Sequence, residues 1–174
     1  YFYITNGNAG VQVYMHSKQF PELKVGDRVQ VSGEISLPYG ETRIKVAGAE
    51  NIKVIGSEDI APVNYSVDEI SSLASGALVA VEGEITEIKS AYAYIDDGEG
   101  EIKIVFKKNT GIDKAAFSLG DIVRVQGIFI SKSDEMQVLL RSADDLIKID
   151  GAVGEEDAGA LGTTSPVGKY LMAT

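Results

Sequence analysis

An internal repeat is the feature that most constrains the fold of this chain. Residues 1–14 align without a gap to residues 92–105, at a constant offset of 91 positions. Both segments contain an alternating run, a glycine-containing turn and a second alternating run, which predicts a β-hairpin. Residues 23–33 align to residues 117–127 at an offset of 94, and this offset holds to the end of the second copy. The three extra residues of the second copy fall between the hairpin and the next strand, as expected when one β-rich unit is used twice.

The two copies differ at their beginnings. Residues 77–88 precede the second hairpin and alternate apolar with polar residues, which predicts a long first strand. The first copy has no equivalent because the chain begins at Tyr1, inside a predicted strand. We therefore expect a fragment of a longer protein, with a first unit that lacks its opening strand.

The remaining segments connect or follow the two units. In the connector, Ser66 followed by Glu69 predicts the capped start of a short helix. The last residues are rich in Gly, Ala, Thr and Ser and show no periodicity, which favours a flexible linker. The predicted order is an incomplete unit over 1–56, a connector over 57–76, a second unit over 77–150 and a flexible C-terminal linker over 151–174.

Composition and charge restrict the function classes. Hydrophobic residues make up 44% of the chain, and the absence of cysteine excludes disulfides and thiolate metal sites. No apolar run is long enough for a membrane span within the chain, and no secretory signal peptide is visible. The net charge of −10 argues against a strong non-specific grip on phosphate. However, residues 1–56 carry six Lys/Arg against five Asp/Glu, whereas residues 57–150 carry nine against eighteen. The first copy is therefore the better candidate for binding a polyanion.

Two motifs, each present in both copies, resemble those of a known family. Tyr3–Gly7 and Tyr94–Gly98, each followed by an alternating strand, resemble the second and third strands of the OB-fold. A Gly-Asp turn at 26–27 and at 120–121, leading into a Val-x-Val-x-Gly strand, resembles the approach to its fourth strand. The likeness covers residues 1–55 and 77–150 and is greatest to OB domains of bacterial secreted or cell-surface proteins, including extracellular nucleases. It implies an all-β fold of two tandem five-stranded OB-like Greek-key barrels, and an extracellular or cell-surface location.

The OB-fold binds ligands on the face of its second and third strands and in nearby loops. Alternation turns Ile4, Val11 and Val13 toward the core, and Ile95, Ile102 and Ile104 likewise in the second copy. In nucleic-acid-binding members of the family, residues at positions like Tyr1, Tyr3 and Gln12 contact bases, which is what the resemblance implies here. The candidate binding residues are the outward-facing hairpin side chains and nearby loop or strand residues: Tyr1, Tyr3, Gln12, Tyr14, Tyr39, Arg43, Lys45, Tyr92, Tyr94 and Lys103.

A purely structural interpretation of these tyrosines stays open. Paired aromatic residues on a small sheet often stabilise it as cross-strand pairs, by ~0.2–1 kcal/mol, whereas base stacking contributes ~1–3 kcal/mol per base. In the first copy both interpretations stand. In the second copy four carboxylates, Asp96, Asp97, Glu99 and Glu101, would repel phosphate, which favours the structural interpretation there.

Catalytic and metal chemistry is poorly supported by the sequence. His16 is the one histidine and falls in a predicted loop, without the buried, oriented imidazole that nucleophilic catalysis needs. The acidic turn at 96–101 lacks the spacing that wraps a calcium ion, and its Asp and Gly residues suit a hairpin turn. The glycine-rich stretches join strand to strand and open no helix, so they are not phosphate loops. We expect no catalytic residue, no metal and no cofactor.

The sequence thus predicts a non-catalytic binding module, most simply one that binds single-stranded nucleic acid through the OB face of the first unit. The alternative is a carbohydrate- or protein-binding accessory or spacer domain of a larger secreted or surface protein. Expected partners are a single-stranded nucleic acid or an oligosaccharide, and other domains of the same larger protein. A catalytic domain could lie outside the fragment.

Overall fold

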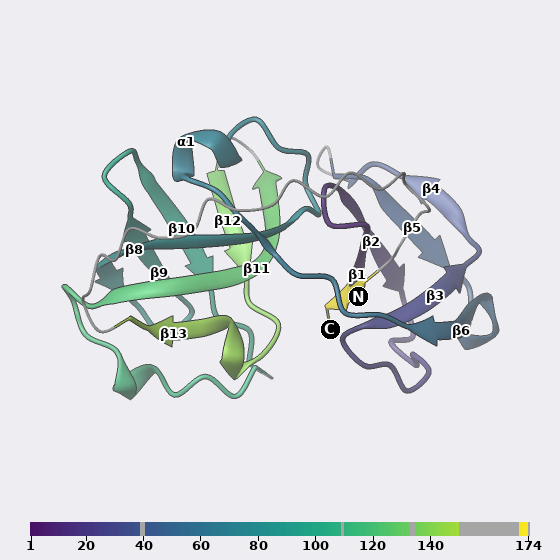
Figure 1. Cartoon of the computed structure of the whole chain (residues 1–174). Helices are drawn as coiled ribbons and strands as arrows, with labels where there is room; N and C mark the ends of the chain where they lie inside the picture. The colour runs from purple at the N-terminus through teal and green to yellow at the C-terminus, as the bar shows by residue number, and fades with distance from the viewer. Residues whose placement is uncertain (39–40, 109, 133–134, 150–170, 174) are drawn as a thin grey trace.

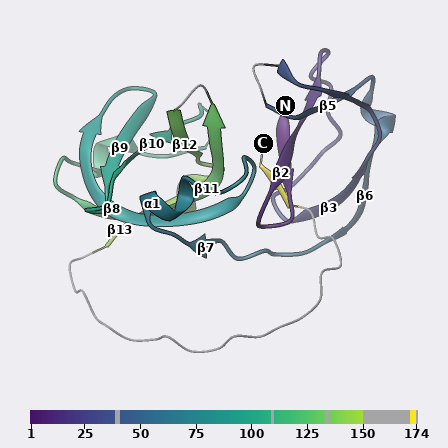
Figure 2. The same cartoon turned by 90° about the horizontal axis from the view of Figure 1, so that it is seen from above.

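The computed structural model describes residues 1–38, 41–108, 110–132, 135–149 and 171–173. Two β-rich lobes lie side by side, with the beginning of the chain and its last strand between them (Figures 1 and 2). Apart from one short α-helix and three-residue 3-10 turns, the regular elements of the described residues are strands, so the predicted all-β class is confirmed.

The N-terminal lobe is built from the strands of the first copy together with one C-terminal strand. These strands are β1 (Phe2–Thr5), β2 (Gly10–Met15), β3 (Asp27–Val31), β4 (Glu34–Ser36), β5 (Arg43–Val46), β6 (Ile52–Ser57) and β14 (Leu171–Ala173). They form a five-stranded sheet in the order β14-β1-β2-β5-β4 and a two-stranded sheet of β3 and β6.

The other lobe, called the C-terminal barrel below, contains the second copy. Its elements are β7 (Val63–Asn64), α1 (Val67–Ile70), β8 (Leu78–Ile88), β9 (Tyr92–Asp96), β10 (Glu101–Val105), β11 (Ile122–Lys132), β12 (Glu135–Leu139) and β13 (Leu146–Lys148). The sheet order is β13-β11-β12-β10-β9-β8-β7, and an additional pairing between β11 and β8 closes strands β8 to β12 into a five-stranded barrel. This is the pairing order of the OB-fold, in which the first strand meets both the second and the fourth.

The length of two strands explains the closure. Both β8 and β11 have eleven residues, so each pairs with two neighbours along its length. β8 pairs with β11 from Leu78 to Glu84 and with β9 from Glu84 to Ile88. The long first strand expected over 77–88 is therefore confirmed.

The N-terminal lobe repeats most of these pairings. The hairpin β1–β2 corresponds to β9–β10, and the parallel pair β2–β5 corresponds to the parallel pair β10–β12. The antiparallel pairs β4–β5 and β3–β6 correspond to β11–β12 and β11–β13. The single strand β11 is thus represented by two shorter strands, β3 and β4, in the N-terminal lobe.

The Gly-Asp motif forms the same turn in both copies. Gly26 has φ 92° and Gly120 has φ 84°, a left-handed conformation that favours glycine. The next residue closes the turn: the Asp27 carboxylate accepts a hydrogen bond from the N–H of Lys24 at 2.8 Å, and Asp121 does so from Ser118 at 2.9 Å. The motif is therefore a structural device that starts β3 and β11.

The cores follow the predicted alternation. Ile4 and Val13 are buried in the N-terminal lobe, where Val11 packs beside them. Ile95, Ile102 and Ile104 are buried in the C-terminal barrel. Complete burial of one such side chain stabilises a fold by roughly 1.5–3 kcal/mol.

The two lobes are joined by close contact. A Cβ added to Gly76, before β8, would lie 2.3 Å from the Cα of Gly10 in β2, so the backbones meet at this point. The N–H of Leu78 donates to the carbonyl of Gly7 at 2.8 Å, and the N–H of Gly10 donates to Ser75 at 3.2 Å. These contacts fix the hairpin of the first copy against the first strand of the second.

The short helix of the connector begins as predicted. Ser66 is its N-cap: the Ser66 side chain accepts from the N–H of Glu69, and the Glu69 carboxylate accepts from the N–H of Ser66. Asp97, from the acidic turn, also accepts from the N–H of Val67 at 2.7 Å. Within the described part of the chain, no helix has the length and apolar character needed to cross a membrane.

The C-terminal segment differs in part from expectation. Residues 151–170 and 174 of the predicted linker lie outside the described residues. Leu171–Ala173 form β14, which pairs antiparallel with β1. A strand paired in a sheet is not a linker, so the expectation does not hold for these three residues.

Candidate binding surface

The predicted residues of the first copy lie on the face of β1, β2 and β5 that is turned away from the lobe's own core. The hairpin register places Tyr3 opposite Gln12. The parallel pairing of β2 with β5 then places Gln12 beside Arg43, and Tyr14 beside Lys45. The structure therefore brings these five candidates together on three neighbouring strands.

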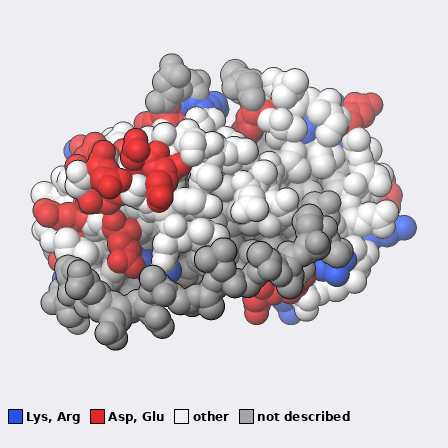
Figure 3. All heavy atoms as spheres, turned by 45° about the horizontal axis from the view of Figure 1, so that its top comes forward, with Lys and Arg blue, Asp and Glu red and all other residues white. Residues whose placement is uncertain are grey.

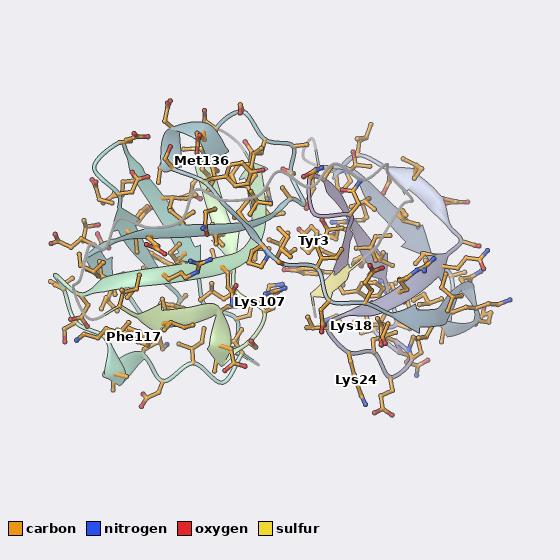
Figure 4. The ribbon with its side chains drawn as sticks, in the orientation of Figure 1. Tyr3, Lys18, Lys24, Lys107, Phe117 and Met136 are labelled. Carbon is orange, nitrogen blue, oxygen red and sulfur yellow. The ribbon has the colours of Figure 1, made fainter. Side chains whose placement is uncertain are left out.

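Tyr3 is buried against the C-terminal barrel. Only 3% of the residue is exposed, and it belongs to a cluster with Leu78 and Ile128 (Figure 4). Its hydroxyl donates a hydrogen bond to Oε1 of Glu41 and accepts one from Nε2 of Gln12 at 3.1 Å. Burial, followed by the hydrogen bond to Glu41, raises the pKa of Tyr3 well above its ordinary range. The prediction that this ring is available for stacking is wrong, because the second copy covers the face that alternation turns outward.

Gln12 is also committed to internal contacts. It is 5% exposed, and its Oε1 accepts a hydrogen bond from Nε of Arg43 at 2.7 Å. The guanidinium carbon of Arg43 lies 4.6 Å from the centroid of the Tyr14 ring, within cation–π range. A chain of contacts thus runs from Glu41 through Tyr3 and Gln12 to Arg43. It holds Arg43 in place instead of presenting Gln12 to a ligand.

Tyr1 is the exposed aromatic residue of this surface, at 48%. Its ring meets the Tyr3 ring edge to face, with centroids 5.9 Å apart. Nζ of Lys107 lies 4.7 Å from the Tyr1 ring centroid. Arg43 is connected to this ring through Gln12 and Tyr3, and Lys18 lies in the loop after β2. Tyr1, Lys18, Arg43 and Lys107 are called the Tyr1 cluster below.

Two cations of the Tyr1 cluster are held by loops. Lys107 follows β10 in the C-terminal barrel and reaches across to the N-terminal lobe, whereas Lys18 follows β2 (Figure 4). Burial lowers the pKa of Lys107, an effect that the Glu41 carboxylate partly offsets. Lys18 has φ 57°, a left-handed conformation that is uncommon outside glycine. A partly desolvated ammonium beside an exposed ring, and a lysine in a left-handed backbone conformation, are features that binding sites often have.

The equivalent face of the C-terminal barrel has the same framework with different charges. Glu135 stands where the first copy has Glu41 and accepts hydrogen bonds from the Tyr94 hydroxyl at 3.4 Å and from Nζ of Lys103 at 2.8 Å. That bond to Glu135 is the main cause that raises the pKa of Lys103. Nζ of Lys103 also lies 4.6 Å from the Tyr92 ring centroid, and the Tyr92 and Tyr94 rings meet edge to face at 5.6 Å. These contacts fit the structural interpretation of the two tyrosines, which the acidic sequence of the second copy favours over ligand stacking.

The acidic turn of the second copy binds backbone. Oδ1 of Asp97 accepts hydrogen bonds from the N–H groups of Glu99 and Gly100, and Oδ1 of Asp96 accepts one from Gly98. Burial alone would raise the pKa of Asp97, but the backbone hydrogen bonds outweigh it and lower the pKa. Over the described ranges, no group of three or more His, Cys, Asp or Glu side chains is arranged to hold a metal ion.

Carboxylates gather over the C-terminal barrel. Figure 3 shows Asp and Glu side chains concentrated on that lobe, beside a mostly uncharged N-terminal lobe in the same view. In the same lobe, Glu82, Glu84, Asp96 and Asp97 line one pocket. A nucleic-acid backbone would be repelled from this side of the molecule.

The other predicted residues are peripheral or outside the described ranges. Lys45 is exposed at the edge of the Tyr14 and Arg43 pair, and His16 is exposed in the loop after β2. Tyr39 lies outside the described residues.

Three residues of the surface were missed by the sequence prediction: Lys18, Lys107 and Glu41. Lys107 belongs to the second copy and reaches the first through packing between lobes, for which the sequence carries no signal. Glu41 could have been found: it aligns with Glu135, and a carboxylate at the same place in both copies indicates a shared contact with the hairpin tyrosine.

Comparison with known proteins gives only distant likenesses. No family model matches the chain, and no curated protein sequence matches it. Among solved structures, the chain is similar to the hypothetical protein YgiW from E. coli, with 18% identity, a TM-score of 0.41, and coverage of 50% of this chain and 90% of that one. It is similar to the S. pombe Stn1–Ten1 complex, with 12% identity, a TM-score of 0.44, and coverage of 55% and 83%. It is also similar to a murine DNA-binding protein bound to double-stranded DNA, with 11% identity, a TM-score of 0.37, and coverage of 84% and 82%. At these identities and scores, the likenesses assign no function to this chain.

Proposed function

We propose that this chain is a non-catalytic module that binds single-stranded nucleic acid across the Tyr1 cluster. The observation that carries the proposal is the contact between the exposed ring of Tyr1 in the N-terminal lobe and Nζ of Lys107 from the C-terminal barrel. In this proposal the N-terminal lobe acts as an OB-like barrel of its own, in tandem with the C-terminal barrel. The module belongs to a larger secreted or cell-surface protein.

Each part of the Tyr1 cluster has a role that suits an unpaired strand. The half-exposed ring of Tyr1 can stack on a base of any identity, which contributes ~1–3 kcal/mol. In this proposal Lys18, Arg43 and Lys107 contact phosphates on either side of that base. Glu41 is the opposing charge, but its carboxylate already accepts the Tyr3 hydroxyl, so its acceptor capacity is partly used. The cluster therefore favours a stacked base flanked by phosphates.

The equivalent face of the C-terminal barrel lacks this combination. Lys103 is paired with Glu135, and the acidic turn lies at the end of the same hairpin. In the proposal the second copy contributes Lys107 and a rigid support, and it does not bind nucleic acid on its own hairpin face.

A titration of labelled single-stranded oligonucleotide tests the proposal. The expected result is binding at low salt that weakens as salt rises, with a slope of about −0.7 in log–log form per phosphate contact. The variant Lys107→Gln should flatten that slope by about 0.7, because it removes one contact. Lys24→Gln, which changes an exposed lysine outside the Tyr1 cluster, is the matched control and should leave the slope unchanged. Absence of binding at low salt, or equal slopes for both variants, would contradict the proposal.

A second candidate is an accessory or spacer role, in which the module binds a carbohydrate or protein or simply separates other domains. The internal chain from Glu41 to Arg43 favours it, because this chain uses Tyr3 and Gln12 for structure. Arrays of immobilised oligosaccharides, tested beside the oligonucleotide, separate the two candidates: the spacer role predicts binding to neither.

A further inference from the structure

In the C-terminal barrel, β8 closes the structure by meeting two strands. It pairs with β9 on one side and with β11 on the other. The strands that correspond to β9 and β11 in the N-terminal lobe are β1 and the split pair β3–β4. Closure of that lobe therefore requires a strand between β1 and β3.

β14 lies at this place. It pairs antiparallel with β1 and is also in contact with β3. Its register matches that of β8: Ile4 faces Met172 as the equivalent Ile95 faces Ile85, and Thr5 faces Leu171 as the equivalent Asp96 faces Glu84. A matching register is a strong constraint, because a shift by one residue would exchange the two faces of the strand.

The lobe remains open where the described part of β14 does not reach. β14 has three residues, whereas β8 has eleven. Phe129 of β11 is 0% exposed beside the start of β8, yet Ile35, at the equivalent position in β4, is 67% exposed. The exposure marks the edge that an opening strand covers in the second copy.

We propose that β14 is the opening strand of the N-terminal lobe, supplied in cis by the C-terminus of the same chain. The inference deepens the proposed function, since it rests on the N-terminal lobe being an OB-like barrel. The tandem then consists of one barrel with strands in sequential order and one that is circularly permuted. The edge of β1 that pairs with β14 also lies beside the Tyr1 cluster, because Tyr3 pairs with Ala173 and its ring meets the ring of Tyr1.

The chain is long enough for this arrangement. Twenty-one residues separate Ile149, the last described residue of the second copy, from Leu171. An extended segment of that length spans at most about 70 Å. A domain of about 150 residues has a radius of gyration of about 15 Å. One chain can therefore reach from β13 to β1 without a second copy.

A pair of introduced cysteines tests directly whether β14 of the same chain lies along the edge of β1. The chain has no cysteine of its own that would interfere. Thr5→Cys combined with Leu171→Cys places two thiols on directly opposed residues, at the separation that a disulfide or a short thiol cross-linker spans. Oxidation at low protein concentration should give an intramolecular cross-link in most of the protein, detected as a faster-migrating monomer without reductant. The single variant Thr5→Cys is the control for random dimer formation.

Two results would overturn the inference. Cross-linked dimers beyond the level of the single-cysteine control would assign the edge of β1 to a second copy. Absence of any cross-link, in protein that remains folded by circular dichroism, would show that β14 does not occupy the edge. Oligonucleotide titration of the same protein separates failure of the β14 assignment from failure of the proposed function. Cross-linking without nucleic-acid binding refutes only the proposed function. Nucleic-acid binding without cross-linking refutes only the assignment of β14 as the opening strand.

Discussion

The N-terminal lobe and the C-terminal barrel use the same strand pairings but bury different residues. Phe129 is fully buried in β11, and Ile35, at the same place in β4, is largely exposed. The converse holds on the hairpin face, where Tyr3 is 3% exposed and the equivalent Tyr94 is half-buried. The framework of the repeat is therefore shared, while burial depends on what each copy has beside it. Within the described residues, the closing strand of the first copy is the three-residue β14, and that same copy has its hairpin face covered by the other lobe.

The largest effect that would break the comparison is a core truncation at equivalent positions. Phe129→Ala should lower the free energy of unfolding by about 3–5 kcal/mol, because it empties a fully buried site. Ile35→Ala should change it by no more than about 0.5 kcal/mol, as expected for an exposed side chain. Urea denaturation of both variants measures the difference. Comparable losses would mean that the edge of β4 is covered in solution.

The junction between the lobes gives the next largest effect. Gly76→Ala combines a left-handed φ of 91° with a Cβ that would lie 2.3 Å from the Gly10 backbone, and should cost about 2–4 kcal/mol. Gly98→Ala has the same φ of 91° but no atom within 4 Å of its Cβ, and should cost only about 1–2 kcal/mol. Thermal and urea unfolding of the two variants isolate the steric part. If both variants lose the same stability, the lobes do not meet as described.

The smallest effect concerns the buried tyrosine of the junction at high pH. Because the pKa of Tyr3 is raised above its unfolded value of about 10, its contribution to stability is complete below pH 10 and is lost as the pH rises further. Tyr3→Phe has no hydroxyl to ionise and therefore escapes this loss. The free energy of unfolding of the parent should fall relative to that of Tyr3→Phe by up to about 1.4 kcal/mol per pH unit above pH 10. Urea unfolding at pH 8, 10 and 11 measures it. Tyr94→Phe, at the equivalent site, should leave most of the alkaline loss in place.

The sequence predicts the local elements of this molecule well and the packing between its two copies poorly. Alternation and the repeat identify the hairpins, the inward-facing Ile4 and Ile95, and the capped helix at Ser66, because these follow from local chemistry. Burial of Tyr3 and the position of Lys107 depend on packing between two copies, which no periodic pattern encodes. The pairing of β14 with β1 joins the two ends of the described chain, and a segment rich in small residues gives no sign of its partner.

The difference between local pattern and packing between the copies also explains which candidate binding residues are exposed. Tyr3 and Gln12 face away from the core of their own lobe, as alternation predicts, but the other lobe lies on that side. Tyr1 remains exposed because it precedes β1 and lies at the rim of the covered face. Alternation predicts which side chains face away from the core, and among the described residues of that face the tertiary structure leaves the ring of Tyr1 exposed.

The central claim is that the first copy binds single-stranded nucleic acid and the second does not. The most direct test compares Tyr1→Ala with Tyr92→Ala, which truncate equivalent residues of the two hairpins, in oligonucleotide titrations at low salt. Tyr1→Ala should weaken binding about 5- to 150-fold, the equivalent of ~1–3 kcal/mol for one stacked base, whereas Tyr92→Ala should bind like the parent protein. Equal losses in the two variants, or a loss confined to Tyr92→Ala, would show that the first copy is not the binding unit.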